Sequence, residues 1–185
     1  MNHLNKLIAV LALLLSGCSS LTVQNYGVAA DANYALKQLK VTEAVFMGEI
    51  SNPSNSEISC RMMGPIKFAN NMTAASYIKK ALEDELKLSG TYASKAPKVV
   101  LGGTINKLEM SSTQGMSRGF WLIDLTIRSS NGKSIKVVEN YQFESGFDGN
   151  TACFNTTTAF MPAVQNLITK LVNDSQFKEL VTTSN

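Results

Sequence analysis

Residues 119–144 read GFWLIDLTIRSSNGKSIKVVENYQFE, and this stretch decides the fold. Apolar and polar side chains alternate over Gly119–Ser129 and again over Ser134–Glu144, which is the period of a β-strand with one buried face. Ser130-Asn131-Gly132 lies between them and is typical of a turn. The sequence therefore predicts an antiparallel hairpin around which the rest of the domain is arranged.

The length of the turn determines which residues of the two strands face each other. A two-residue Asn-Gly turn would place Ile127 opposite Lys136 and mix the apolar with the polar face. A three-residue loop with Gly132 in the left-handed conformation keeps the faces apart. It pairs Ile127 with Ile135, Leu125 with Val137, and Trp121 with Tyr141. We predict this longer loop. Glu139 would then face Ile123, and we expect it to lie at a sheet edge or to pair with a lysine.

Further segments predict helices and strands on either side of the hairpin. Thr73 is a suitable helix cap, apolar residues recur at helical spacing after it, and Gly90 suits a left-handed end. A second long helix is expected to start between Ala159 and Met161, because Pro162 fits a first turn. The remaining expected elements are a short helix over Ala32–Leu39 capped by Asp31, a strand over Val41–Ile50, and a strand over Lys98–Met110 with a bulge near Asn106.

The order of the main elements is strand, helix, strand, strand, strand, helix. Both long helices can cover the same face of the sheet. We therefore predict an α+β fold: a two-layer sandwich in which a four-stranded, mostly antiparallel sheet carries two long helices on one face.

The first residues resemble a bacterial lipoprotein signal. Lys6 precedes an apolar run from Leu7 to Leu15, which is too short to span a bilayer. Leu15-Ser16-Gly17-Cys18 then matches the lipobox, with small residues before the cysteine. The resemblance implies that the chain is cut before Cys18 and that Cys18 carries acyl chains that bind a membrane. An ordinary secretory signal with an incidental cysteine is the alternative.

This signal divides the chain into three parts. Residues 1–17 form the signal peptide, residues 18–30 have no sustained period and are predicted as a tether, and residues 31–185 form a single α+β domain. Residue 19 is Ser, and in enteric-type sorting a residue other than Asp there implies release to the outer membrane. We expect a lipid-anchored outer-membrane protein that faces the periplasm. Exposure at the cell surface stays open.

The composition fits a folded, exported domain. Apolar residues make up 44% and charged residues 17% of the chain, as in globular proteins. The net charge of +3 is spread without a Lys/Arg run, so no nucleic-acid partner is expected. The single histidine, His3, lies in the signal, so the mature chain lacks the commonest acid–base group and metal ligand. No cluster of Cys, His and carboxylates suggests a metal site, and no cofactor is expected.

Two cysteines remain once Cys18 is assigned to lipid. Cys60 and Cys153 would meet an oxidising periplasm, where such a pair is most simply a disulfide. The bond would close a loop of about 93 residues. Two buried free thiols are the alternative.

The chain looks like the small envelope lipoproteins of the YajG-like family in its lipobox, its tether, its element order and its ending, Ala163–Ile168 with Phe177–Leu180. More distantly, they are similar to LptE-like and transport-auxiliary lipoproteins of Gram-negative bacteria. The resemblance implies a non-enzymatic accessory protein of envelope assembly or transport, with a protein or lipid of the envelope as its partner. The Cys60/Cys153 pair and the stretch Cys60–Pro65 are not part of the family pattern.

Two short motifs suggest enzymes and are better explained as turns. Gly115-Met116-Ser117-Arg118-Gly119 matches the G-x-S-x-G pattern of hydrolases, but a strand follows the serine where a helix is needed, and no histidine is left to take its proton. Gly132-Lys133-Ser134 lacks the earlier glycine of a phosphate-binding loop. We therefore expect no enzyme. A hydrolase of an envelope polymer with a carboxylate or Ser–Lys site, and a structural spacer that contacts the cell wall, remain as alternatives.

Two groups of side chains are candidates for contacts with a partner. Asp124, Thr126 and Arg128 share one face of a predicted strand, and they form either an ordinary solvated surface or a polar binding strip. Met62, Met63 and Met72 gather between the first strand and the first long helix, where they either fill the core or form an adaptable apolar surface. Core filling is the first interpretation.

Overall fold

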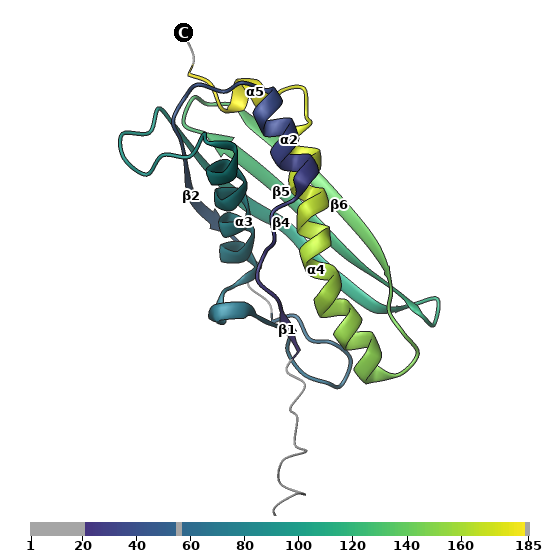
Figure 1. Cartoon of the computed structure of the whole chain (residues 1–185). Helices are drawn as coiled ribbons and strands as arrows, with labels where there is room; N and C mark the ends of the chain where they lie inside the picture. Colours follow the sequence, from purple (N-terminus) through teal and green to yellow (C-terminus); the bar gives the residue numbers. More distant parts are fainter. Residues whose placement is uncertain (1–20, 55–56, 184–185) are drawn as a thin grey trace, which may run out of the picture.

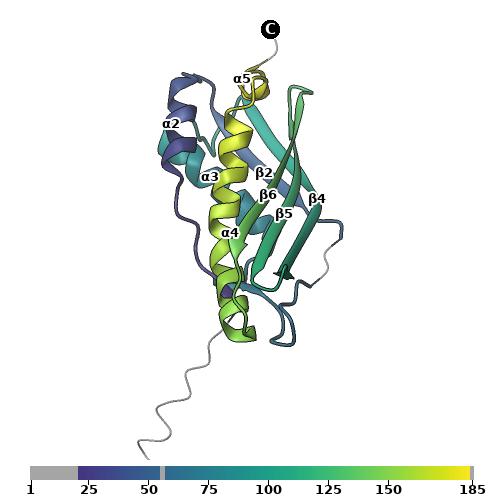
Figure 2. The ribbon, with the colours of Figure 1, turned by 90° about the vertical axis from the view of Figure 1, so that its right-hand side faces the viewer.

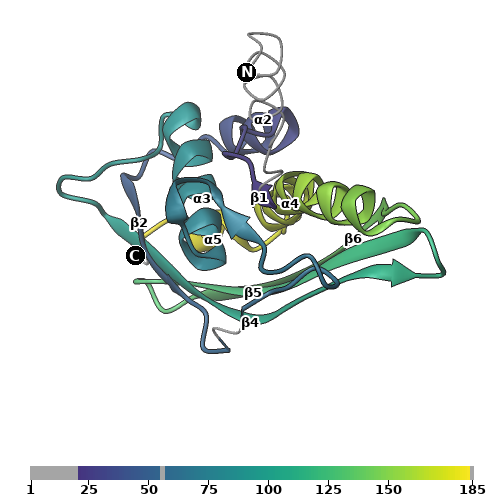
Figure 3. The ribbon, with the colours of Figure 1, turned by 90° about the horizontal axis from the view of Figure 1, so that it is seen from below.

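A computed structural model describes residues 21–54 and 57–183 and has two layers, a sheet and a set of helices that covers one of its faces (Figures 1 to 3). The signal peptide and Cys18 lie outside the described residues. The predicted α+β class is confirmed. Among the described residues, none of the helices combines the length and the apolar composition needed to cross a bilayer.

The sheet has four strands in the order β2-β4-β5-β6. Their bounds are β2 Val45–Ser51, β4 Val99–Gln114, β5 Arg118–Ser129 and β6 Ser134–Glu144. β2 lies parallel to β4, and the other two pairings are antiparallel. Helix α3, Ala74–Ser89, makes the crossover between the two parallel strands. The strands β4, β5 and β6 follow one another as hairpins, so most of the sheet is antiparallel.

The hairpin that organises the sequence forms with the predicted register. Trp121 pairs with Tyr141, Leu125 with Val137 and Ile127 with Ile135. Gly132 has a φ of 86°, which is the left-handed conformation that the three-residue loop requires. Glu139 faces Ile123 and is buried on the edge strand β6, where Lys170 of helix α4 pairs with it at 2.6 Å. Both expectations for Glu139 are confirmed.

The bulge in β4 is also confirmed. The pairing of β4 with β5 shifts by one residue between Ile105 and Lys107, so residues after the shift change faces. The expected strand over Lys98–Met110 runs further, to Gln114, because β4 stays paired with β5 as far as Gln114 and Arg118. The first strand is shorter than expected and starts at Val45.

Helix α3 begins and ends where the sequence predicts. The Thr73 hydroxyl accepts a hydrogen bond from the Ser76 N–H at 3.1 Å, and the Thr73 N–H donates to the Ser76 hydroxyl at 2.8 Å. This reciprocal capping satisfies two backbone N–H groups at the start of the helix. Gly90 ends the helix with a φ of 82°.

Helix α4 is longer than predicted. It spans Gly149–Val172, starts with an Asp148 cap, and holds Pro162 in its interior. The sequence prediction of a start between Ala159 and Met161 is therefore wrong. The added turns are rich in polar residues, but Thr156 is buried: its hydroxyl donates to the Ala152 carbonyl at 2.7 Å, and its own carbonyl accepts from Trp121 Nε1 at 2.9 Å. These bonds let a threonine-rich stretch pack as the buried face of a helix.

The segment before the domain is packed on it. β1, Thr22–Val23, pairs in parallel with β3, Lys67–Phe68, and Val23 is 0% exposed. Helix α2, Ala30–Gln38, follows at once. Residues 21–30, which we predicted as part of a tether, therefore belong to the folded domain.

Helix α2 does not use the predicted cap. Asp31 lies in its first turn, and Ala29 is the N-cap residue without a side-chain cap. The Ala29 N–H donates instead to the carboxylate of Glu85, on helix α3, at 2.6 Å. A long-range acceptor has replaced the local one, which sequence patterns do not reveal.

The core lies between the sheet and the helices. Phe160 of α4 stands edge-on to Trp121 of β5 and to Tyr77 of α3, with ring centroids 4.8 and 5.3 Å apart. Phe68 closes the cluster from β3. The short elements that complete the fold are the 3-10 turn η1, Ala69–Asn71, and helix α5, Phe177–Leu180.

Candidate functional site

The first candidate is the polar strip on the sheet face that the helices leave open. Asp124 and Thr126 of β5 are joined by Asn106, whose Nδ2 donates to Asp124 Oδ1 at 2.7 Å and to Thr126 Oγ1 at 2.8 Å. Arg128 donates to Thr104 Oγ1 at 3.0 Å, and Lys136 pairs with Asp124 at 3.0 Å. The predicted residues thus share one face, and all three form hydrogen bonds within the strip.

The electrostatics of the strip centre on Asp124. Partial burial disfavours its charged form, but the hydrogen bonds from Asn106 and Lys136 outweigh that effect, so the pKa of Asp124 lies below its ordinary value. The carboxylate is therefore charged at neutral pH and already neutralised by Lys136. A partner that binds here has to compete with these internal bonds.

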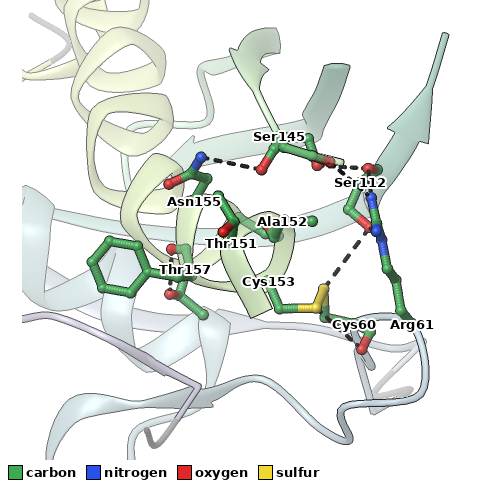
Figure 4. The surroundings of a disulfide bond; sticks show 12 residues. Cys60, Arg61, Ser112, Ser145, Thr151, Ala152, Cys153, Asn155 and Thr157 are labelled. Carbon is green, nitrogen blue, oxygen red and sulfur yellow. Dashed lines mark hydrogen bonds between the residues drawn. A yellow bond between two sulfur atoms is a disulfide. The ribbon is translucent and has the colours of Figure 1, made fainter. Parts of the chain in front are cut away.

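The second candidate is the end of the molecule that carries the disulfide. Cys60 and Cys153 are bonded and fully buried, and they join the loop before β3 to the first turns of α4 (Figure 4). The predicted disulfide is present in the structure. Cys153 lies within α4 itself, because that helix begins at Gly149.

Arg61, next to the disulfide, joins its own loop to strand β4 and to the connection between β6 and α4. Its Nε donates to the Ser112 hydroxyl at 3.1 Å, and its Nη2 donates to the carbonyls of Ser112 at 2.8 Å and Gly146 at 3.2 Å. Its Nη1 donates to the Phe147 carbonyl at 3.0 Å. A guanidinium has several donors in a fixed plane, so one side chain can serve acceptors from β4 and from the β6–α4 connection.

The G-x-S-x-G stretch lies at this same end and forms the turn between β4 and β5. The Ser117 carbonyl accepts from the Ser145 N–H at 2.7 Å and from the Gly146 N–H at 3.3 Å. Gly115 and Met116 both have positive φ. The motif therefore fixes the tip of the hairpin against the β6–α4 connection, as expected for a turn. We call the three cross-linked segments, residues 58–66, 112–118 and 144–155, the disulfide end.

The methionines near the disulfide do not fill the core. Met62 is fully exposed, with a relative exposure of 101%, and Met63 is exposed as well. Met72 alone packs against the core, from a half-buried position. The first interpretation was wrong for Met62 and Met63, whose side chains are exposed on the loop that the disulfide and Arg61 hold in place. The alternative of an apolar contact surface fits these two residues.

Comparisons with known proteins identify the fold. No family model matches the sequence, and no curated protein matches it. A Xanthomonas campestris protein of the DUF330 family matches with a TM-score of 0.51 and 16% identity, over 85% of this chain and 93% of that protein. This chain shares its fold with that protein. At this identity the likeness concerns the fold alone.

Two further solved structures match less well. They are the PelC dodecamer of Paraburkholderia phytofirmans, with a TM-score of 0.41, 12% identity and 86% and 95% coverage, and a candidate lipoprotein of Caulobacter crescentus, with 0.40, 13%, and 78% and 92%.

Sequence reasoning missed a buried carboxylate. Glu85 is 0% exposed, and its Oε1 accepts from the Tyr26 hydroxyl at 2.7 Å and from the Ala29 N–H. Burial first, and then the bond to Glu85, raise the pKa of Tyr26 far above its ordinary value. The sequence does indicate the burial of Glu85 by its position, since Glu85 falls on the apolar face of its helix, beside Leu82 and Leu86.

The described residues contain no group of three or more His, Cys, Asp or Glu side chains that could hold one metal ion. Cys60 and Cys153 are engaged with each other. The two candidates that remain are the polar strip, with its hydrogen-bonded side chains, and the disulfide end, with its exposed methionines.

Proposed function

We propose that the protein is an outer-membrane lipoprotein on the periplasmic side that acts as a non-enzymatic binding or accessory protein in envelope assembly or transport. The observation that carries the proposal is the Leu15–Cys18 lipobox at the end of a short apolar segment. A disulfide in the folded domain agrees with an oxidising compartment.

The chemistry of the surfaces supports a binding role. Ser117, in the hydrolase-like motif, lies in a turn between two strands, and the mature chain has no histidine to activate it. Asp124 and Arg128 are engaged in bonds to neighbouring side chains and so are not set up to transfer protons, and a partner at the strip would exchange these bonds for its own.

Mass spectrometry of the mature amino terminus tests lipidation directly. The expected result is an N-terminal peptide that starts at Cys18 and carries the added mass of its acyl chains. In the Cys18→Ala variant that peptide is expected to be missing from the membrane fraction. The matched control is the double variant Cys60→Ala/Cys153→Ala, which loses the other two cysteines and should keep the acylated peptide. An unmodified Cys18 would refute the proposal.

A substitution at residue 19 tests which of the two membranes holds the protein. Wild-type protein should sediment with the outer membrane in a density gradient, and Ser19→Asp should move it to the inner membrane. The substitution leaves the described residues unchanged, so a shift reports sorting and not folding. Equal distribution of both proteins would contradict the outer-membrane assignment.

The accessory role is tested by photo-crosslinking in intact cells. A photoreactive residue at position 136, beside Asp124 on the polar strip, is expected to yield adducts with a defined envelope component. The matched control is position 80, an exposed lysine on the outer side of α3. Identical adduct patterns at both positions, or none at either, would argue against the strip as a binding face.

A further inference from the structure

Large apolar side chains are exposed at the disulfide end. Phe147 is 80% exposed, and Met116 and Phe154 are also largely exposed, in addition to Met62 and Met63. They come from three loops and from the first turns of α4, which are far apart in sequence. Single exposed apolar residues are common on proteins, but a group of five at one end indicates a contact surface.

The backbone beneath these side chains is cross-linked. The disulfide fixes the loop of Met62 and Met63, and Arg61 ties that loop to the carbonyl of Phe147. The turn that carries Met116 is held to the β6–α4 connection through the Ser117 carbonyl. The apolar residues are thus displayed by a fixed frame. Collapse onto the core would break these bonds.

The described part of the chain begins at the same end of the molecule. Thr22 and Phe154 line one surface hollow, so β1 runs beside the start of α4. Figure 1 shows β1 at the end opposite to α5. Three peptide units separate Cys18 from Leu21 and can span at most about 11 Å. The Leu21 carbonyl accepts from the Lys67 N–H at 2.8 Å, so the chain is held in place from that residue onward.

We propose that Met62, Met63, Met116, Phe147 and Phe154 enter the interface of the membrane that holds the acyl chains of Cys18. This inference rests on the proposed lipidation, because the short connection brings the disulfide end to the bilayer. Methionine is flexible and aromatic rings favour the membrane boundary, so both residue types suit shallow insertion.

Charged groups around the patch limit its depth. Asp148 and Glu144 are exposed beside Phe147, and the Asp148 carboxylate caps α4 by accepting from the Thr151 N–H at 2.9 Å. Arg118 stands opposite Glu144 on the neighbouring strand. These groups have to stay hydrated, so the apolar side chains reach the headgroup boundary and the domain rests on the membrane.

Depth-dependent quenching tests the contact in the complete acylated protein. Phe147→Trp and the matched control Tyr34→Trp, on helix α2, each place a tryptophan at an exposed aromatic position. Both proteins are reconstituted into phosphatidylethanolamine–phosphatidylglycerol vesicles with and without brominated acyl chains. Trp121 is buried and contributes the same background to each.

The tryptophan at position 147 is expected to emit at shorter wavelength and to lose about half of its emission to the brominated lipid, as for a side chain at the acyl boundary. The tryptophan at position 34 should be unaffected. Flotation of the vesicles separates the two hypotheses. Protein that floats without quenching at position 147 keeps its lipid anchor and overturns the membrane contact, which leaves a protein partner or a second copy as the occupant. Protein that does not float overturns both.

Discussion

The hydroxyl of Tyr26 donates a 2.7 Å hydrogen bond to the buried carboxylate of Glu85, across 59 positions of sequence. The same carboxylate oxygen accepts from the N–H of Ala29, and Asn33 donates to the Glu85 carbonyl at 3.2 Å. One glutamate on α3 thus fixes the segment that leads from β1 into α2. That segment would connect the membrane anchor to the core.

Tyr26→Phe is expected to destabilise the protein by about 1–3 kcal/mol, because it takes a hydrogen bond from a buried carboxylate. Urea unfolding followed by the fluorescence of Trp121 measures the change. Tyr34→Phe is the control, since Tyr34 is 67% exposed. Equal stability of Tyr26→Phe and wild type would mean that the bond contributes nothing to folding.

The buried Tyr77 and the partly buried Tyr26 lead us to expect a loss of stability at alkaline pH. Burial raises the pKa of Tyr77, and burial together with Glu85 raises that of Tyr26. A raised pKa means that the folded state keeps a proton which the unfolded state releases above pH about 10. Stability is therefore complete below that pH and decreases as the pH rises beyond it.

Tyrosinate absorbance checks this alkaline prediction. Of the five tyrosines, Tyr26 and Tyr77 should ionise only as the protein unfolds. The Tyr26→Phe variant should show a shallower decrease of stability above pH about 10 than wild type. Titration of all tyrosines in one step in the folded protein would contradict the assignment.

Removal of the disulfide by Cys60→Ala/Cys153→Ala should lower the free energy of unfolding by about 2–4 kcal/mol, since the bond closes a long loop in the unfolded chain. Thermal unfolding with and without reductant measures it. Reductant should lower the midpoint of wild type and leave the double variant unchanged. Labelling of Cys60 or Cys153 by a thiol reagent in unfolded, unreduced protein would show that the bond is not formed.

Arg61→Lys is expected to loosen the disulfide end without unfolding the domain. An ammonium group cannot reach the four acceptors that the guanidinium serves, and a lost hydrogen bond to a charged group costs about 1.5–3 kcal/mol. Amide hydrogen exchange should become faster at residues 145–147. Arg128→Lys, on the open sheet face, is the matched control and should leave exchange there unchanged.

The local patterns of the chain predicted the sheet and one helix well. The pairing of Trp121 with Tyr141 followed from alternation and from the demands of Gly132, because a one-residue slip would have turned every apolar side chain outward. Thr73 and Gly90 marked the ends of α3 for equally local reasons. Alternation, caps and turns act over a few residues, and a sequence displays them directly.

Features that depend on distant partners could not be predicted in the same way. The start of α4 was missed because Thr156 is buried only through its bonds to Trp121 and Ala152. The role of Arg61 depends on carbonyls 51 and 85 residues away. The polar strip was predicted from one strand, whereas Asn106 and Lys136, which engage Asp124, come from the two strands beside it.

The first described strand and the last described helix lie at opposite ends of the molecule (Figures 1 and 2). If the disulfide end rests on the bilayer as proposed, a fluorescent reporter joined beyond α5 has the full height of the domain beneath it. Energy transfer from such a reporter to a dye in the membrane would then read that height, and with it whether the domain stands upright or lies flat.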